Sequence, residues 1–352
     1  MFNSAIVGCG IIGQIHAKAY AACKEIRLAA VVDIVPERAE AAGKAHGVPF
    51  TTRLEDVLAR DDIHFIDVCT PSGTHGDIAI AAAKAGKHCI SEKPLDVTPQ
   101  RCDQIIRAFK KSGTTLGGIY QHRFADDTQR TKAAIAAGRL GRITLATCST
   151  NWWRAQEYYD SGDWRGTWNL DGGGCLMNQG VHAIDLLLYF VGPVRTVTAR
   201  TALLAHKNIE VEDVAVAALE FHGGTLGLIQ GTTAVYPGSS VRHEIMGSDG
   251  MVYLEDDKAT LWAFRRQAAE DQIGPAGAPR VGGHWKDLPS DLFVRNMDNI
   301  ARAAREGAPP LVTGEEHKRA VEVICAIYKS AHTGKPVTLP LKRFVPPSAG
   351  RK

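Results

Sequence analysis

Short apolar runs alternate with helical patterns over the first third of the chain. The runs occupy residues 5–7, 28–32, 63–69, 88–91 and 115–120. The first run leads into a helical pattern that extends to about Cys23, and the third leads into another that covers Ala79 to Ala85. Strands that alternate with helices are typical of a parallel sheet with helices on both faces. The pattern therefore predicts an α/β domain with a doubly wound parallel sheet over residues 1–124.

The pattern changes after Phe124. A helical stretch at 127–137 precedes β-type segments connected by short turns, at 143–150, 194–204, 214–221, 225–235, 241–246, 251–254 and 260–264. Alternating strands joined by short turns are typical of an antiparallel meander. We expect residues 125–352 to form an α+β domain with a large, mostly antiparallel open sheet, one face of which helices cover. The other face is either solvated or pairs with a second subunit.

Two further segments complete this second domain. Residues 266–289 are rich in Gly, Pro and polar groups, which predicts a long loop that is either disordered or part of a substrate lid. A last helix, 314–332, follows the capping box that begins at Thr313 and stops before Gly334. Its apolar stripe predicts that it docks on one of the two domains, and docking back onto the first domain is one alternative.

The stretch DGGGCLMNQGVHAID, residues 171–185, is the strongest candidate for chemistry. Its apolar residues recur at helical spacings from Met177 onward. At about 100° per residue, Asn178, His182 and Asp185 fall together on the polar flank of this stripe. Three polar groups would then face one cavity. The alternative is a buried helix with a histidine satisfied in the core.

Composition excludes several classes of function. With 352 residues, 45% of them hydrophobic, the chain is long enough for two globular domains. A net charge of +3 gives no polyanion signal, so we expect no nucleic-acid partner. The N-terminal residues lack the features of a secretion signal, and no apolar run approaches the roughly 18 residues of a membrane span. We expect a cytoplasmic protein without a membrane partner. Its eight scattered cysteines contain no CxxC pair, which predicts reduced thiols and no metal site.

A glycine motif follows the first apolar run directly. Gly8, Gly10 and Gly13 form GxGxxG around Ile11 and Ile12, between a strand and a helix. The first glycine permits a tight turn, the second leaves room for a pyrophosphate beside backbone N–H groups, and the third lets the helix pack closely on the sheet. This context predicts a dinucleotide site, whereas a glycine-rich turn alone is the alternative.

The second strand predicts which dinucleotide binds. It ends at Asp33, twenty residues after Gly13. A carboxylate at this place accepts hydrogen bonds from the ribose hydroxyls and repels a 2′-phosphate. Arg38 lies five positions further on and could soften this preference. We therefore expect NAD as the cofactor, with NADP the weaker alternative.

Polar residues also follow the other predicted strands. Ligands of such sheets sit outside the carboxyl ends of the strands, so we expect the residues there to contact the cofactor or the substrate. They are Thr70 and Pro71 with His75 beyond them, Glu92 and Lys93 before Pro94, and Gln121 and Arg123. For an isolated lysine or arginine, a solvated charge or a surface salt bridge is the alternative.

Three motifs stand in order over nearly the whole chain. They are GCGIIG at 8–13, EKP at 92–94, and GGG at 172–174 followed by Asn178-x-x-x-His182. Together they resemble the glucose–fructose oxidoreductase, inositol dehydrogenase and rhizopine-catabolism protein (Gfo/Idh/MocA) family. The resemblance implies a Rossmann domain followed by an α/β domain whose large open sheet often builds homodimers or homotetramers. It also implies that Lys93 and His182 face the nicotinamide and the substrate hydroxyl.

The resemblance carries one departure and one hint about the substrate. In many relatives the residue that matches Asn178 is an aspartate, whereas this chain has a neutral amide. The runs WRGTW at 164–168 and LMNQGVH at 176–182 look most like relatives that act on sugars and on nucleotide-linked sugar acids at carbon 3. Residue 178 is therefore a position where substrate choice could be set.

The chemistry expected of these residues is the oxidation of a secondary alcohol. It needs a hydride acceptor beside the C–H bond, which nicotinamide supplies, and a base on the O–H group. His182 can take the hydroxyl proton near neutral pH and return it in the reverse direction. Lys93 would stabilise the developing alkoxide. Asn178, the third candidate catalytic residue, can orient a neighbouring hydroxyl without adding charge.

The remaining candidates are contacts to the ligands. Arg165 lies in the loop before the glycines and is a candidate for the cofactor or the substrate. Trp153 could stack on a sugar ring, although a core tryptophan is the alternative. The candidate cofactor contacts are Gly8, Gly10, Ile11, Ile12, Gly13, Asp33, Arg38, Thr70, Pro71, His75, Glu92, Lys93, Gln121 and Arg165. The candidate substrate contacts are Lys93, Arg123, Trp153, Asn178, His182 and Asp185.

These observations favour one function over two others. The first is an NAD-dependent oxidoreductase that interconverts a ring hydroxyl and a ketone of a sugar, cyclitol or related polyol. Within this class, a 3-dehydrogenase of a nucleotide sugar like UDP-N-acetylglucosaminuronate is the alternative. The second is a glycoside hydrolase that keeps NAD bound and forms a ketone transiently. The third is a cofactor-sensing regulator, which ranks last because Lys93 and His182 are both present.

Overall fold

The computed structural model describes residues 1–266, 268, 271, 290–341 and 343–347 and divides the chain into two compact units. Unit 1 comprises Met1–Gln121 and Pro289–Lys318, and unit 2 comprises His122–Leu288 and Arg319–Lys352. The segment 266–289, expected to be a loop or lid, lies almost wholly outside the described residues.

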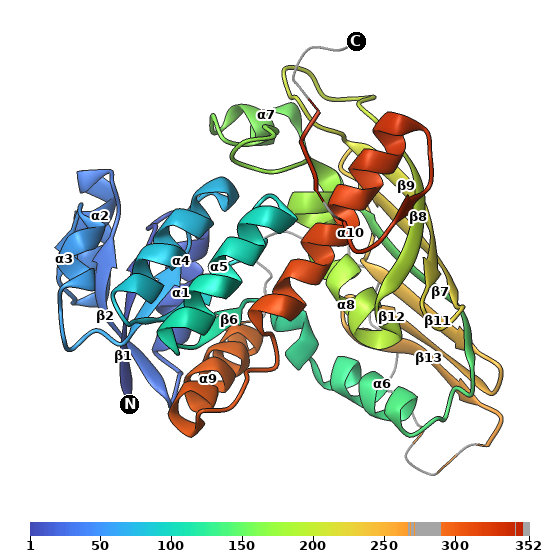
Figure 1. Ribbon diagram of the computed structural model, residues 1–352, viewed down its shortest axis with the longest axis horizontal. Coiled ribbons are helices and arrows are strands. Elements are labelled where there is room, and N and C mark those ends of the chain that lie inside the picture. Colours follow the sequence, from blue (N-terminus) through green and yellow to red (C-terminus); the bar gives the residue numbers. More distant parts are fainter. Residues whose placement is uncertain (267, 269–270, 272–289, 342, 348–352) are drawn as a thin grey trace. The chain divides into compact units, whose positions relative to one another are not determined.

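Unit 1 is built on a six-stranded parallel sheet in the order β3-β2-β1-β4-β5-β6 (Figure 1). The strands are β1 (Phe2–Val7), β2 (Ile26–Val32), β3 (Phe50–Thr51), β4 (Phe65–Val68), β5 (His88–Ser91) and β6 (Leu116–Gly118). Every residue of β4 is buried, as expected for a strand covered on both faces. The strand order reverses between β1 and β4, and in such sheets ligands bind at this switch point.

Helices cover both faces of this sheet. They are α1 (Ile11–Tyr20), α2 (Pro36–His46), α3 (Leu54–Leu58), η1 (Ser72–Thr74), α4 (His75–Lys84), α5 (Pro99–Ser112) and α9 (Ser290–Glu306). Right-handed crossovers that run in opposite directions from β1 and β4 place their helices on opposite faces. Accordingly α4 packs beside α5, and α1 packs beside α9. The doubly wound parallel sheet predicted from the sequence is confirmed.

Helix α9 is absent from the expectations above. It joins unit 1 although it lies late in the chain, and Asp298 accepts hydrogen bonds from the backbone N–H groups of Lys24 and Glu25 beyond α1. Its buried residues Leu292, Met297 and Ile300 recur at helical spacings. An amphipathic pattern was therefore present in the sequence and predicts this helix.

Unit 2 contains an eight-stranded sheet in the order β13-β12-β11-β7-β10-β9-β8-β14. The strands are β7 (Ile143–Asn151), β8 (Val194–Ala202), β9 (Val214–Phe221), β10 (Leu226–Thr232), β11 (Arg242–Gly247), β12 (Gly250–Glu255), β13 (Lys258–Phe264) and β14 (Val337–Thr338). Strands β7 and β10 pair in parallel, and the other neighbours pair antiparallel. The large, mostly antiparallel sheet predicted from the sequence is confirmed.

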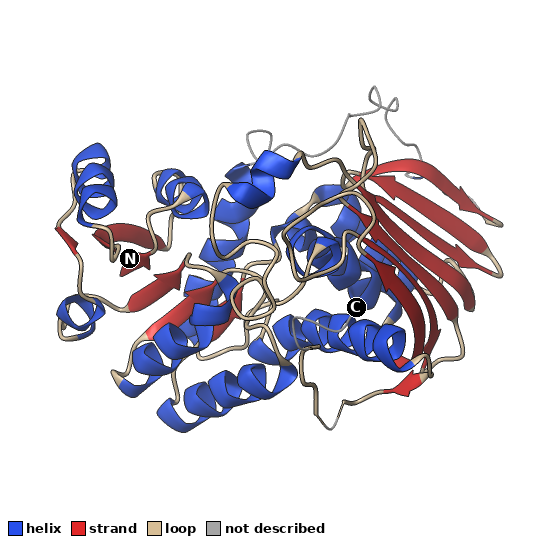
Figure 2. Ribbon diagram, turned by 90° about the horizontal axis from the view of Figure 1, so that it is seen from above, coloured by secondary structure: helices blue, strands red, loops and turns tan. Residues whose placement is uncertain are grey.

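Helices pack on one face of this sheet (Figure 2). They are α6 (Asp126–Ala136), α7 (Gln156–Asp160), η3 (Cys175–Gly180), α8 (Val181–Val191) and α10 (Gly314–Thr333), with η2 (Gln121–Phe124) at the entrance to the unit. Helix α8 lies against β7 and β11. Helix α10 begins at the predicted cap, where the Thr313 hydroxyl accepts from the N–H of Glu316, and its first residues, up to Lys318, belong to unit 1.

Two expectations from the sequence concerned disulfide bonds and membrane-spanning helices. The eight cysteines form no disulfide, and all except Cys23 are buried. Within the described part of the chain, no helix is long and apolar enough to cross a membrane.

Candidate active site

The glycine motif of unit 1 has the geometry of a dinucleotide loop. Gly8 has φ +102°, and a Cβ there would lie 2.6 Å from the carbonyl oxygen of Cys69. A Cβ on Gly13 would lie 2.0 Å from the carbonyl oxygen of Gly8, so both positions require glycine. At Gly10, nothing lies within 4 Å of the corresponding point. The first turn of α1 is thus left open beside its backbone N–H groups, which suits a pyrophosphate.

Asp33 joins this loop to the end of β2. Its carboxylate accepts from the N–H of Cys9 at 2.8 Å and from the N–H of Val35 at 2.9 Å, one bond to each oxygen. Each oxygen keeps a lone pair for a ribose hydroxyl. Ile34, which follows directly, is 88% exposed and offers an apolar surface that would suit an adenine ring, a candidate that the sequence analysis missed. These residues fit NAD.

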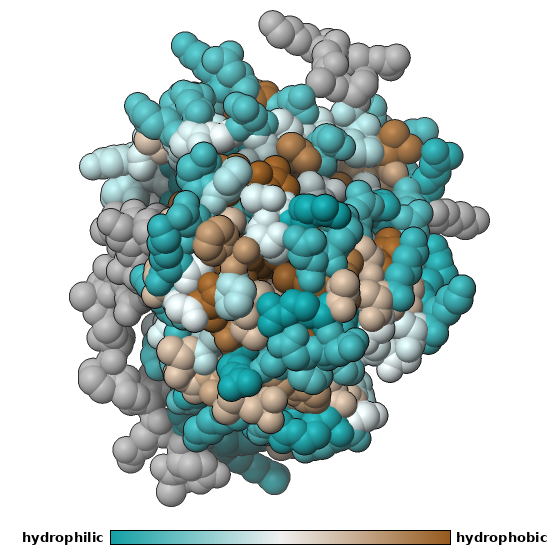
Figure 3. Space-filling model, turned by 90° about the vertical axis from the view of Figure 1, so that its left-hand side faces the viewer, coloured by the Kyte–Doolittle hydropathy of each residue, from teal (hydrophilic) through white to brown (hydrophobic). Residues whose placement is uncertain are grey.

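Some apolar side chains of unit 1 are exposed. Seen from the side of α2 and α3, polar side chains cover most of the surface, and apolar side chains gather around a hollow near the middle of the view (Figure 3). Ile11, the first residue of α1, is half exposed, whereas Ile12 is half-buried. Arg38 lies exposed on α2, and no ion-pair partner for it occurs among the described residues.

His75 ties together two of the strand-end segments named above. Its Nε2 lies 2.8 Å from the carbonyl oxygen of Thr70, and its Nδ1 lies 2.8 Å from the carbonyl oxygen of Pro94. The ring is buried at the start of α4, and burial lowers the pKa of His75. Both ring nitrogens of His75 therefore contact backbone carbonyl groups, one of which belongs to the residue before Pro71. His75 thereby ties these two strand-end segments together.

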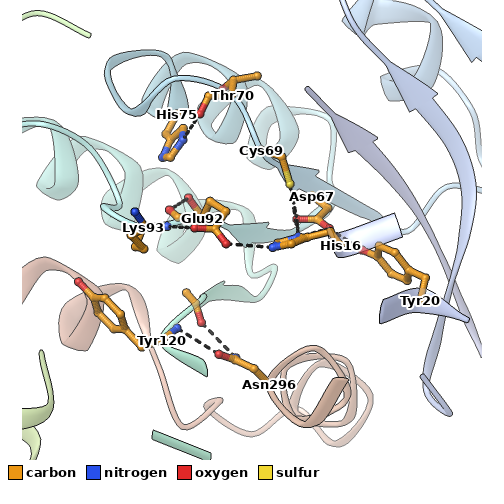
Figure 4. A network of polar contacts seen from close by, with 12 residues as sticks. His16, Tyr20, Asp67, Cys69, Thr70, His75, Glu92, Lys93, Tyr120 and Asn296 are labelled. Atoms are coloured by element: carbon orange, nitrogen blue, oxygen red, sulfur yellow. Dashed lines mark hydrogen bonds and ion pairs between the residues drawn. The ribbon is translucent and has the colours of Figure 1, made fainter. Parts of the chain in front are cut away.

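Lys93 lies directly after β5 at the carboxyl edge of the sheet, with a half-buried side chain. Its backbone N–H donates to Oε2 of Glu92 at 2.9 Å, and Oε1 of Glu92 lies 2.9 Å from Nε2 of His16 (Figure 4). Glu92 is buried, and although burial opposes its charged form, the hydrogen bond from His16 holds the pKa of Glu92 below its usual value. The segment that carries Lys93 is thus anchored to α1. Gln121, at the end of the same unit, is also buried.

In unit 2 the glycine-led segment begins as a π-helix, η3, before α8. Glu212, in the loop before β9, accepts from the N–H groups of Gly174 at 2.9 Å and Leu176 at 3.0 Å. The Tyr328 hydroxyl donates to the same carboxylate at 2.9 Å. Burial raises the pKa of Glu212. This carboxyl group holds the first turn of the segment, so it fixes where Asn178 and His182 lie.

Asn178 has a carboxylate as its neighbour. Its Nδ2 donates to Oδ1 of Asp171 at 2.7 Å, while Oδ2 of Asp171 accepts from the N–H of Gly166. Because an ionised carboxylate only accepts, this bond fixes the orientation of the Asn178 amide. A carboxylate, that of Asp171, therefore lies directly beside the neutral amide at residue 178.

His182 lies in the first turn of α8, and its ring meets the ring of His122 edge-on, with centroids 4.9 Å apart. Nδ1 of His122 pairs with the carboxylate of Asp257, which sits in the turn between β12 and β13. Burial opposes the charged form of His122, but Asp257 outweighs this effect and raises the pKa of His122. His122 and Asp257 thereby help to orient the His182 ring.

Arg123 and Asp185 point at one another. The guanidinium donates from Nε at 2.8 Å and from Nη2 at 2.6 Å to the two carboxylate oxygens, and both side chains are only 2% exposed. The Arg123 guanidinium also lies over the Tyr189 ring. Of the three polar residues expected on one flank, Asp185 thus contacts Arg123, Asn178 contacts Asp171, and His182 contacts His122.

Aromatic rings and guanidinium groups gather in the loop after β7. Trp153 is 37% exposed and meets Tyr236 edge-on. The guanidinium of Arg165 lies 4.6 Å from the centroid of the Tyr158 ring, and that of Arg154 lies 5.4 Å from it. Two cationic groups therefore contact one ring, which places positive charge directly beside Tyr158.

Four residues of unit 2 that shape this site were not among the candidates from the sequence: Asp171, His122, Glu212 and Asp257. Asp171 opens the glycine-led stretch and His122 follows a predicted strand, so their positions carried a weak signal. Asp257 lies 135 residues from His122, and nothing in the sequence pairs them.

A glycine loop at the switch point of a parallel sheet, a carboxylate after β2 and a lysine after β5 define a dinucleotide-dependent oxidoreductase. The chain belongs to the GFO/IDH/MocA oxidoreductase family. The family's NAD-binding Rossmann fold matches residues 2–120, and its C-terminal domain matches residues 128–253. The family and the NAD-binding domain expected from the motifs are confirmed.

Three similar proteins indicate the range of the family. The WlbA dehydrogenase of Bordetella pertussis, solved with NADH and UDP-GlcNAcA, is 35% identical, with a TM-score of 0.85 over 97% of this chain and 99% of that chain. The WlbA dehydrogenase of Chromobacterium violaceum, solved with the same ligands, is 32% identical, with a TM-score of 0.86 over 97% of each chain. The inositol 2-dehydrogenase of Rhizobium meliloti is 29% identical over 341 residues, which cover 95% of this chain and 98% of that protein.

Proposed function

We propose that the protein interconverts a ring secondary hydroxyl and a ketone of a sugar, cyclitol or related polyol. NAD, when bound, accepts the hydride from the carbinol carbon. His182 takes the hydroxyl proton, Lys93 stabilises the developing alkoxide, and Asn178 orients a neighbouring hydroxyl without adding charge. The observation that carries the proposal is the placement of Lys93 at the carboxyl edge of the NAD-binding sheet, on a segment fixed by the buried Glu92 carboxylate.

The test is a screen of sugars and polyols with NAD and with NADP, followed by nicotinamide absorbance. We expect NAD to be reduced by at least one ring alcohol, and Lys93→Ala and His182→Ala each to lose most of the rate. Removal of one group that stabilises charge costs on the order of 10²–10³ in kcat. The proposal would be wrong if NAD bound but no alcohol in the screen were oxidised, and if Lys93→Ala changed nothing.

A finer proposal concerns the substrate, which we infer to be a nucleotide-linked sugar acid. Its support is the 35% and 32% identity to two dehydrogenases solved with UDP-GlcNAcA, together with the paired guanidinium groups of Arg154 and Arg165 at Tyr158. An anionic substrate gains from these cations, and a neutral polyol does not. Arg165→Gln should therefore raise KM for UDP-GlcNAcA and leave KM for myo-inositol unchanged.

The same assays separate the oxidoreductase from the redox-assisted hydrolase. An oxidoreductase accumulates one NADH for each molecule of ketone formed. A hydrolase that forms a ketone only transiently releases a cleaved glycoside without net NADH. Chromatography of the products beside the absorbance record distinguishes the two outcomes.

We also propose that two or more copies assemble through the open face of the sheet in unit 2. Five apolar residues on its strands are exposed by 36–59%: Leu145, Val216, Leu226, Leu228 and Met251. Leu226 pairs directly with Leu145, so the patch runs across neighbouring strands. Light scattering should show a dimer or tetramer that Leu226→Glu with Leu228→Glu dissociates, whereas Leu204→Glu, outside the strands, should leave it intact. Reduced cysteines and use of NAD favour a cytoplasmic location.

A further inference from the structure

Unit 1 contains a row of charged side chains inside its core. His16 of α1, Asp67 of β4 and Glu92 after β5 are at most 4% exposed. Nδ1 of His16 lies 2.9 Å from Oδ2 of Asp67, and Nε2 lies 2.9 Å from Oε1 of Glu92. Figure 4 shows His16 between the two carboxylates, with Lys93 on the far side of Glu92. The row therefore runs from the interior of the sheet to its carboxyl edge.

The surroundings of this histidine favour its protonated form. Burial opposes the charged form, but the carboxylate of Asp67 outweighs burial and raises the pKa of His16 well above its usual value. Both ring nitrogens face carboxylate oxygens, so both must carry a proton to donate. The Cys69 thiol lies 3.3 Å from Nδ1, and the Phe293 ring of α9 meets the imidazole edge-on. An imidazolium ion thus joins two carboxylates where water is excluded.

Stability alone is a weak reason to keep such a row. Removing three charged groups from water costs free energy that their mutual attraction only partly returns, and well-packed apolar residues often serve as well. Buried charged networks are retained more readily where they fix a geometry that apolar packing would leave loose. The function of this row therefore follows from which atoms it holds in place.

Those atoms belong to the segment of Lys93. Glu92 uses one oxygen for His16 and the other for the backbone N–H of Lys93, at 2.9 Å each. The next carbonyl, that of Pro94, is held by His75 at 2.8 Å. The segment is therefore fixed on both sides of the Lys93 Cα atom. His16 is the only one of these anchors that lies on α1, whose first turn follows the glycine loop.

We propose that His16 is a positioning residue for Lys93, acting through the Glu92 carboxylate. The row ties the helix that starts at the dinucleotide loop to the strand end that carries the lysine. The row thereby holds Lys93 in place relative to the loop, while His16, which is 0% exposed, does not itself touch a ligand. This proposal rests on the role of Lys93 proposed above, because the position of an idle lysine would have no effect on the rate.

The first test reads Lys93 directly and needs no substrate. The lysine amines of the full chain are reductively methylated with ¹³C, and Lys93→Arg identifies the Lys93 resonance in a ¹H–¹³C spectrum. We expect His16→Gln to move or broaden this resonance, because glutamine can bridge only one of the two carboxylates. Glu92→Gln should act in the same direction and disturbs the core less, so it serves where His16→Gln fails to fold.

Tyr20→Phe is the matched control. The Tyr20 hydroxyl donates to Asp67 at 2.9 Å and lies at the end of the row away from Lys93. Its loss removes a hydrogen bond from the same network and leaves the link between His16 and Glu92 in place. The Lys93 resonance should therefore stay where it is. An unchanged resonance in His16→Gln or Glu92→Gln, or an equal change in Tyr20→Phe, overturns the proposal.

The second test measures rates with the alcohol found by the screen. A displacement of about 1 Å at a reacting group can cost on the order of 10² in rate, so kcat should fall 10- to 100-fold in His16→Gln, while the Kd for NADH from fluorescence titration stays unchanged. A merely structural role lowers the melting temperature, and kcat of the folded fraction stays as in the native chain. If the resonance moves and no alcohol is oxidised, the proposed function fails while the positioning by His16 stands.

Discussion

Asn178→Asp places two carboxylates in contact, and the cost can be worked from the geometry. The amide nitrogen of Asn178 lies 2.7 Å from Oδ1 of Asp171, which is buried. Two unit charges about 4 Å apart repel by about 4 kcal/mol at an effective dielectric constant of 20. One of the two groups therefore takes up a proton, and the pair shares it in a short hydrogen bond.

The sign of the pH dependence follows from this shared proton. For a carboxyl group whose pKa is raised in the folded state, stability is highest below the unfolded pKa and is lost as the pH rises. Keeping an ordinary aspartate protonated costs about 1.5 kcal/mol at pH 5, and at pH 8 the cost reaches the limit of about 4 kcal/mol set by the repulsion. The variant should therefore lose about 2.5 kcal/mol more at pH 8 than at pH 5.

The assay is thermal unfolding at both pH values beside the native chain. A difference of about 2.5 kcal/mol corresponds to roughly 5–10 °C for a unit of this size. Adding Asp171→Asn should remove the pH-dependent part, because the new amide can donate to the carboxylate introduced at residue 178 while its oxygen still accepts from Gly166. An equal loss at both pH values, or no recovery in the double variant, would refute the reasoning that Asp171 requires a neutral residue at 178.

Three further predictions follow from other contacts. Arg123→Ala leaves the Asp185 carboxylate buried without its ion-pair partner and should lower the free energy of unfolding by about 3–5 kcal/mol in urea, whereas Arg123→Leu with Asp185→Leu should cost clearly less; equal losses would contradict a buried ion pair. Asp33→Ala removes the acceptor of two backbone N–H groups and of the ribose hydroxyls, so the Kd for NADH in a fluorescence titration should rise at least tenfold, while Arg38→Ala should leave it unchanged. Burial raises the pKa of Asp96 to about 6, so the native chain should lose about 2 kcal/mol of stability between pH 4.5 and pH 7, and Asp96→Asn should lack this loss in urea titrations at the two pH values.

The framework of both units could be predicted from the sequence because it depends on local patterns. Strand β5 was predicted to the residue, and helix α6 to within one residue at each end. Apolar period, glycine spacing and capping act over a few neighbours, so a single sequence displays them. The three site motifs also lie beside predicted strands and helices, which is why Lys93, Asn178 and His182 could be named.

The partners of these residues could not be predicted, because they come from distant segments. Asp257 reaches His122 across 135 residues, and Glu212 reaches Leu176 across 36. The directions of the side chains in the glycine-led segment could not be predicted either. One continuous α-helix was expected, and it would place Asn178, His182 and Asp185 on one flank. The π-helical turn holds Asn178 while the other two residues lie in α8, and each of the three side chains contacts a different partner.

The π-helix at Cys175–Gly180 has a consequence for how this site can change over evolutionary time. A π-turn holds one residue more than the α-helical turn it replaces, so a single-codon deletion within it can be absorbed as an ordinary α-helix. Such a deletion leaves α8, the residues before the turn and the sheet beneath it in place, and changes only which side chains of the turn itself lie near His182. The residue presented beside the histidine would then change without any substitution at that position. Insertions and deletions in this segment are thus a direct way for a lineage to change which alcohol the site accepts.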